Sequence, residues 1–198
     1  MPKIDYFFAP YSSFSYLAGQ RLEAIAARHD AQITYKPVDL VSLYPRTGGK
    51  PVAERHESRR AYRLQDLRRQ AKRLGMPINL QPAFGQVNGA PAAYAIISAQ
   101  RAGGGDLPGL VHGYLRAVWA EERNIADPEV VEDILAEHGF DRQIADRGML
   151  AAAEIYANNL EEAAARGVFG APFYIVDEER FWGQDRLDDL DLYLSGKL

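Results

Sequence analysis

Predicted strands at both ends of the chain enclose a long helical stretch, and this order restricts the possible folds. Residues 4–8 are rich in aromatic and β-branched side chains without sharp alternation, as in a strand buried on both faces of a sheet. Residues 32–38 alternate between apolar and polar side chains, which predicts a second strand. Between them, apolar residues over 14–26 follow helical spacing, and polar residues at 28–30 end that helix. This spacing predicts a right-handed βαβ unit.

The middle of the chain is predicted to be helical, and its end returns to strands. The predicted helices, separated by glycine- and proline-containing loops, cover residues 53–74, 90–102, 110–122, 128–138 and 149–165. Asp127 is a helix cap ahead of a proline at the first helical position. Two short strands and a last helix follow, over residues 173–176, 180–182 and 187–194. The order predicts an α/β fold, a thioredoxin-like sheet (1–45 and 168–198) with a large all-helical insertion domain (46–167) after the second strand.

Composition excludes several classes of site. The 198 residues include no cysteine, so a disulfide framework, a thiolate metal site and a protein-borne redox pair are excluded. The four histidines show no metal-ligand spacing. A net charge of −4 argues against a nucleic-acid partner. No stretch approaches ~20 apolar residues, so no membrane association is expected. The start of the chain lacks signal-peptide features, and we expect a cytoplasmic protein.

Two segments nevertheless have the character of a thiol-handling site. Ser12 stands where a helix begins after the first strand, and helix N-termini stabilise thiolates. Pro172 follows a Gly-Ala turn and opens an apolar strand. Because the chain has no thiol of its own, the pattern suggests that the thiol comes from a ligand. From position alone, the helix N-cap is the favoured role for Ser12, and the Ala171–Pro172 peptide is expected to be trans.

The chain resembles the 2-hydroxychromene-2-carboxylate isomerases and the kappa-class glutathione transferases, thioredoxin-like proteins related to the bacterial disulfide oxidoreductases. The matching segments occur in the family's order over nearly the whole chain, at residues 11–18, 49–51, 117–121, 168–172 and 181–187. The first and last segments are specific, whereas Gly-Lys-Pro alone is weak. Ser13 replaces the family's usual proline, and Ala9 stands in place of an acidic residue.

The resemblance implies a glutathione cofactor whose sulfur accepts a hydrogen bond from Ser12. It also implies that Pro172 is cis and that Ala171 offers its backbone to the extended peptide. Asp185 would meet the α-amino group of glutathione, and the amides around Gln184 its α-carboxylate. From the residues alone, Asp185 could equally be a helix cap.

The basic run over residues 55–73 is expected to be mostly a solvated helix face. Arg59 is the exception, because it aligns with a lysine that reaches glutathione in the kappa enzymes. Together with Lys50 it could hold the glycyl carboxylate or a substrate carboxylate. A flat aromatic substrate needs an apolar slot with few polar groups. Tyr11 and Phe84 are the expected lining, with Asn88 as a polar contact, whereas Trp119 is assigned to the core.

The resemblance implies an isomerase that interconverts 2-hydroxychromene-2-carboxylate and trans-o-hydroxybenzylidenepyruvate, with glutathione as a catalytic thiol that is not consumed. Two alternatives stay open. One is a kappa-type transferase or peroxidase that consumes glutathione, and the other is a non-catalytic binding protein of thioredoxin fold. The partners implied are a small aromatic substrate and a second copy of the chain in a homodimer.

Overall fold

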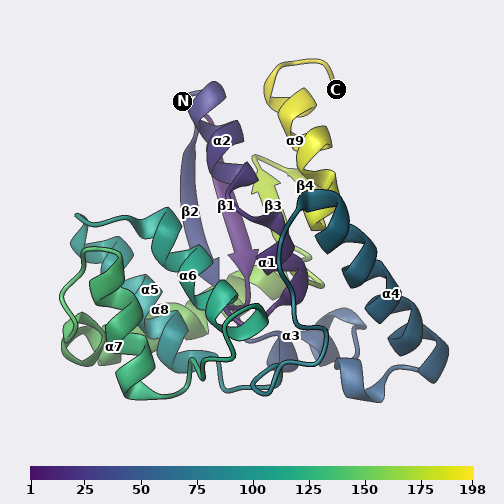
Figure 1. Cartoon of the computed structure of the whole chain (residues 1–198). Helices are drawn as coiled ribbons and strands as arrows, with labels where there is room; N and C mark the ends of the chain where they lie inside the picture. The colour runs from purple at the N-terminus through teal and green to yellow at the C-terminus, as the bar shows by residue number, and fades with distance from the viewer.

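A four-stranded sheet lies between helices on both of its faces in the computed structural model, which describes residues 1–198 (Figure 1). The strand order is β2-β1-β3-β4, formed by β1 (Lys3–Phe8), β2 (Gln32–Pro37), β3 (Phe173–Val176) and β4 (Glu179–Trp182). β1 runs parallel to β2, with Tyr6 opposite Tyr35. β3 is antiparallel to both β1 and β4. The predicted thioredoxin-like fold with helices inserted after the second strand is therefore confirmed.

Alternate residues of the central strands pack into two separate cores. Tyr6, Phe8 and Tyr174 point into the larger core, whereas Phe7 and Phe173 point into a smaller one on the opposite face. Because side chains alternate along a strand, a strand covered on both faces needs apolar residues at every position. This explains the continuous apolar pattern of residues 6–8 and 173–176.

Helices α1 (Ser13–Ala18) and α2 (Arg21–Arg28) replace the single helix predicted over residues 14–26. The chain breaks at Gly19, whose φ of 59° and ψ of −140° suit glycine alone. Both helices bury residues in the larger core, as do α5 (Ala90–Ala102) and α6 (Leu107–Trp119). The smaller core is closed by α8 (Ile144–Ala165) and by α3 (Leu40–Thr47), a helix that was not predicted.

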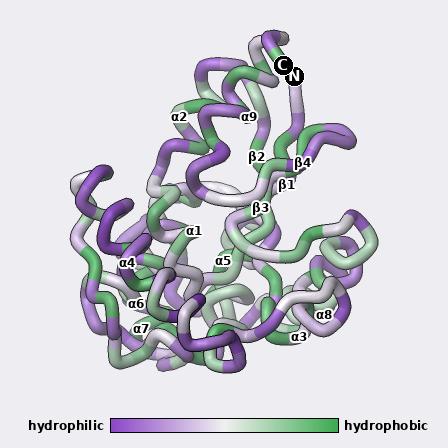
Figure 2. Tube along the Cα trace, turned by 90° about the vertical axis from the view of Figure 1, so that its right-hand side faces the viewer, coloured by the Kyte–Doolittle hydropathy of each residue, from purple (hydrophilic) through white to green (hydrophobic).

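Of the remaining helices, α4 (Glu57–Leu74) and α7 (Pro128–Glu137) pack mainly on other helices, whereas α9 (Leu187–Leu194) contacts β4. α4 follows a short 3₁₀ turn, η1 (Val52–Glu54), and is largely hydrophilic in Figure 2, with only Leu67 and Ala71 buried. α7 begins as predicted, with the Asp127 carboxylate accepting a hydrogen bond from the Glu129 amide. The 3₁₀ turn η2 (Gln184–Arg186) leads into α9, and both termini lie at one end of the molecule (Figures 1 and 2).

Two helices of the insertion begin before their predicted first residue. α6 begins three residues before the predicted Leu110, because the Asp106 carboxylate accepts a hydrogen bond from the Gly109 amide. α8 begins at Ile144, ahead of the predicted 149. The larger core includes residues of both predicted domains, for example Tyr16 and Leu110. The division into domains at 45/46 and 167/168 stays a prediction, and its first boundary falls inside α3.

Candidate active site

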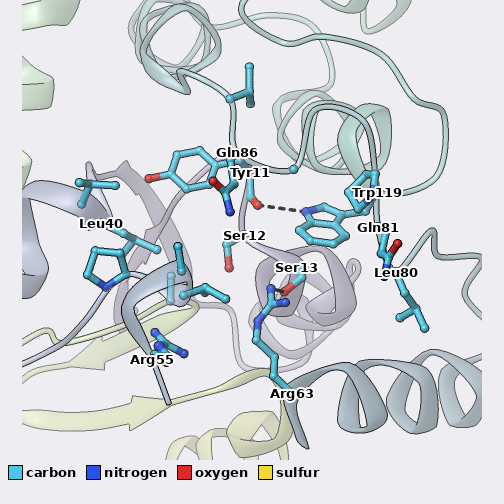
Figure 3. A pocket seen from close by; sticks show the side chains of 18 of the residues that line it. Tyr11, Ser12, Ser13, Leu40, Arg55, Arg63, Leu80, Gln81, Gln86 and Trp119 are labelled. Carbon is cyan, nitrogen blue, oxygen red and sulfur yellow. Dashed lines mark hydrogen bonds between the residues drawn. The ribbon is translucent and has the colours of Figure 1, made fainter. Parts of the chain in front are cut away.

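A cavity of about 730 Å³ opens beside the start of α1 (Figure 3). Its walls come from the loop after β1, from α3 and η1, from α4, from the loop before α5, and from the turn before β3. The 20 lining residues are mostly apolar or aromatic and include no Asp or Glu. The polar and charged ones are Tyr11, Ser12, Ser13, Tyr44, Arg55, Arg63, Gln81, Gln86 and Trp119.

Ser12 lies on the cavity wall and caps α1 at the same time. Its hydroxyl oxygen accepts a hydrogen bond from the Ser15 amide, 3.2 Å away. The hydroxyl hydrogen is not used by this bond, so it stays able to donate to a ligand atom in the cavity. Capping through the hydroxyl oxygen and donation to a ligand are therefore compatible in one side chain.

The turn before β3 supplies a free backbone edge to the cavity. The Ala171–Pro172 peptide is cis, as the resemblance implied. Ala171 lines the cavity, and neither its N–H nor its C=O takes part in a hydrogen bond within the protein. An unpaired donor and acceptor on one residue suit an extended peptide, which can return one hydrogen bond to each. These features fit the backbone of glutathione.

The segment predicted to bind the γ-glutamyl end of glutathione lies next to this edge but outside the cavity lining. The Gly183 amide donates to the Pro172 carbonyl, 2.9 Å away, which brings η2 beside the turn. Gln184 is buried, and both its side-chain oxygen and its backbone carbonyl accept hydrogen bonds from Arg21, at 2.5 Å and 3.0 Å. The Asp185 side chain is 51% exposed and pairs with Arg186 at 3.5 Å.

The structure places Arg55 and Arg63, rather than Arg59 and Lys50, on the cavity wall. Arg59 lies in the first turn of α4 with an exposed side chain. Lys50 is also exposed, and its carbonyl accepts a hydrogen bond from Arg55 Nε at 2.9 Å. Arg63 was not predicted as a site residue, although its spacing from Leu67 indicated a position facing the protein. It precedes the buried Leu67 by four residues, which puts both on the same face of the helix.

The aromatic wall also differs in part from the prediction. Tyr11 lines the cavity as expected, and Gly89 allows its ring to approach, because a Cβ at position 89 would lie 2.7 Å from Tyr11 Cδ1. Burial and the nearby Asp39 raise the pKa of Tyr11, so its hydroxyl stays protonated. Trp119, which was assigned to the core, is buried but also lines the cavity, and its Nε1 donates to the Tyr11 carbonyl at 3.0 Å (Figure 3).

Phe84 and Asn88 do not line the cavity. Phe84 lies half-buried in a tight turn, where the Gly85 amide donates to the Pro82 carbonyl. Asn88 is exposed, and its side-chain oxygen accepts from the Ala90 amide at the start of α5. The neighbouring residues Pro82, Gly85 and Val87 line the cavity instead.

The chemistry available in this cavity comes from hydroxyls, guanidinium groups, aromatic rings and free backbone groups. No cluster of three or more His, Cys, Asp or Glu side chains is arranged to hold a metal ion. None of the helices combines the length and the apolar character that a membrane-spanning segment requires. The arrangement can bind a peptide through Ala171, donate a hydrogen bond from Ser12 and attract an anion through the two arginines.

Known proteins share both the sequence and the fold. The DSBA-like thioredoxin domain matches residues 3–195. A 2-hydroxychromene-2-carboxylate isomerase of Sphingobium xenophagum is 28% identical over 200 residues, covering 96% of this chain and 97% of the relative. The isomerase of Pseudomonas putida is 30% identical over 190 residues, covering 93% and 90%.

Solved structures agree with these relatives. A structure of 2-hydroxychromene-2-carboxylate isomerase superimposes with a TM-score of 0.77 at 26% identity, covering 98% of this chain and 95% of that one. The cytosolic disulfide reductase DsbM of Pseudomonas aeruginosa, solved with GSH, shares the fold with a TM-score of 0.68 at 18% identity, covering 98% of each chain. The chain therefore belongs to the DsbA-like thioredoxin domain family and, within it, to the enzyme family of the 2-hydroxychromene-2-carboxylate isomerases.

Proposed function

We propose that this protein is a glutathione-dependent isomerase acting on 2-hydroxychromene-2-carboxylate or a related aromatic carboxylate. The observation that carries the proposal is the meeting of the Ser12 hydroxyl and the unpaired Ala171 backbone in one cavity walled by aromatic and apolar residues. The relatives' names supply the reaction, and the free edge at Ala171 supplies the fit to a peptide thiol. The cytoplasmic location and the homodimer stay predictions.

Each group of the site has a separate task. Bound glutathione would supply a thiol able to add reversibly to a conjugated carbon, which is nucleophilic catalysis with a borrowed nucleophile. Ala171 would bind and orient the peptide, and Ser12 would donate a hydrogen bond to the sulfur, which favours the charged form of the thiol. The Tyr11 ring and the apolar side chains of Leu80, Pro82, Ala83 and Val87 would hold the flat substrate and exclude water.

The test follows thiol and product together. Purified protein is mixed with 2-hydroxychromene-2-carboxylate and glutathione at a small fraction of the substrate concentration. We expect the substrate to reach its equilibrium with trans-o-hydroxybenzylidenepyruvate, through many turnovers per glutathione, with all free thiol recovered. Stoichiometric loss of thiol with a stable thioether product would establish the transferase alternative. Binding of glutathione without any turnover of this substrate or its analogues would establish the binding-protein alternative.

A further inference from the structure

Among the cavity residues to which the proposed function gives no role are Ser13 and Arg63, which contact each other. We infer that Arg63, held in place by Ser13, binds the carboxylate of the aromatic substrate and makes the cavity selective for ligands that carry one. The inference rests on the proposed function in one respect, because it takes this cavity as the substrate site.

The first observation is the placement of the Arg63 side chain. Its Nη2 donates to the Ser13 hydroxyl oxygen at 2.7 Å (Figure 3). Its guanidinium carbon lies 5.9 Å from the ring centroid of Phe14 and 5.8 Å from that of Trp119. Guanidinium has five N–H donors in a planar fork, and the Ser13 bond uses only one of them. The remaining donors are available to a carboxylate in the cavity.

The second observation is a positive charge that no acidic residue offsets. None of the lining residues is Asp or Glu. Arg55 also lines the cavity, with its guanidinium over the ring of Tyr44, so two cations share one half-enclosed space. Burial and the charge of Arg55 both lower the pKa of Arg63, although an arginine stays protonated. An anion bound beside the two guanidinium groups would offset both the burial of the Arg63 charge and its repulsion from Arg55.

Ser13 acts as a positioning residue. It is the first residue of α1 and is buried, with a relative exposure of 2%. A long arginine side chain loses rotamer freedom when it is fixed, and a preformed hydrogen bond reduces that loss at the moment of binding. The same bond sets the guanidinium beside the rings of Phe14 and Trp119.

The surroundings of Arg63 indicate what the carboxylate is attached to. The indole of Trp119 and the apolar side chains of Leu80, Pro82 and Val87 belong to the same cavity. A carboxylate paired with Arg63 therefore carries its attached group against apolar and aromatic surface. A flat aromatic acid satisfies both requirements, whereas the glycyl carboxylate of glutathione brings no apolar group. Both the aromatic acid and glutathione carry a carboxylate, so the experiment measures the binding of each one separately.

The experiment measures binding without turnover. Calorimetric titrations compare 2-naphthoate with its neutral isostere 2-naphthamide, in the absence of glutathione. For the wild type we expect a preference for the acid of about tenfold or more, the range of a hydrogen bond to a charged group. Arg63→Met, which keeps an apolar stem against the rings, should abolish the preference. Arg59→Met, one turn earlier and exposed, is the matched control and should retain it.

Ser13→Ala tests the positioning role of Ser13 through the same quantity, the affinity for 2-naphthoate relative to 2-naphthamide. It should lower the preference for the acid, and Ser13→Thr, which restores a hydroxyl, should recover it. A merely structural effect would weaken acid and amide equally and would remove Ser13 from the inference. Arg63→Lys gives a second variant at position 63, which should keep part of the preference because it keeps the charge but not the fork.

The outcomes separate this inference from the proposed function. An acid preference unchanged in both Arg63 variants, or absent in the wild type, would overturn the inference even if the protein isomerises its substrate. If Arg63→Met weakens S-methylglutathione but not its glycyl ethyl ester, the carboxylate belongs to glutathione and the substrate assignment fails. An acid preference that depends on Arg63 in a protein without isomerase activity would leave the inference standing while the proposed function fails.

Discussion

Ser12 combines a structural bond with a proposed ligand bond, and the two can be measured separately. Ser12→Ala removes the acceptor for the Ser15 amide and should cost ~1 kcal/mol of unfolding free energy. It should also raise the pKa of the bound thiol and lower turnover, with little effect on glutathione affinity. Urea denaturation measures the first effect, and thiolate absorbance against pH measures the second.

Ser12→Asn is the control for this prediction, because asparagine keeps a capping oxygen. It should restore most of the stability without restoring the hydroxyl. Normal turnover in Ser12→Ala at neutral pH would leave Ser12 with the capping role only.

The Asp185 carboxylate is too exposed to make a strong charged contact with a ligand. Its carboxylate is 51% exposed, so water and salt weaken its attraction for the α-amino group of glutathione. Asp185→Ala should therefore weaken glutathione binding by only ~1 kcal/mol, which calorimetry can detect. Asp189→Ala, which removes the other carboxylate near Arg186, is the matched control. Equal losses in the two variants would mean that Asp185 acts only through Arg186.

At the scale of elements, the break between α1 and α2 depends on one residue. Gly19 has a φ of 59° and a ψ of −140°, a conformation that side chains with a Cβ disfavour. The space at this position is adequate, since an added Cβ would lie 3.8 Å from Met76 Sδ. Gly19→Ala should therefore destabilise the fold by ~1–3 kcal/mol through backbone strain. Thermal denaturation would show it, and Gly75→Ala, in the milder left-handed region, should cost less. An unchanged melting temperature in Gly19→Ala would show that this backbone conformation does not require glycine.

The contact between α2 and β2 should make stability depend on pH. The Glu23 carboxylate accepts a hydrogen bond from the Tyr35 hydroxyl at 2.8 Å, and burial raises the pKa of Glu23 above its ordinary 4.5. The folded state thus holds this proton more tightly than the unfolded state. The resulting stability is fully present below pH 4.5 and is lost as the pH rises through the folded pKa.

Glu23→Gln is uncharged at every pH and tests this sign. Relative to the wild type, its unfolding free energy should be higher at neutral pH than in acid, where the two proteins carry the same charge at position 23. Denaturant titrations at several pH values give the difference. Glu178→Gln, on an exposed turn, is the control and should show no such trend. A flat difference for Glu23→Gln would show that burial does not penalise its charge.

For the whole molecule, the proposed site joins segments from both ends of the chain and from the insertion. Ser12 follows β1, Ala171 precedes β3, and Arg63 lies on α4. A ligand that binds only the folded protein stabilises it, by about 2.7 kcal/mol at a hundred times its dissociation constant. S-methylglutathione should therefore raise the melting temperature but support no turnover, because it has no thiol. Turnover that survives complete removal of glutathione would contradict the borrowed-nucleophile mechanism.

Much of the fold follows from local patterns in the sequence. The helix Ala90–Ala102, the last helix Leu187–Leu194 and the strand Phe173–Val176 have the predicted bounds, because glycines, turns and apolar periodicity mark their ends. The absence of cysteine, read from composition alone, already requires that a thiol at this site come from a ligand. The specific motifs at residues 11–18 and 181–187 identified the family.

The tertiary structure decided which side chains share the cavity. Arg63 and Arg59 are both basic residues on α4, and only packing of the helix against α1 turns Arg63 toward Ser13. Trp119 is apolar and buried, as a core residue would be, yet its indole also forms part of the cavity wall. Phe84 and Val87 lie in one loop, and its path directs only Val87 inward. Helical periodicity and composition are local properties of the chain, whereas a cavity is formed by segments far apart in sequence, so its lining depends on how those segments pack.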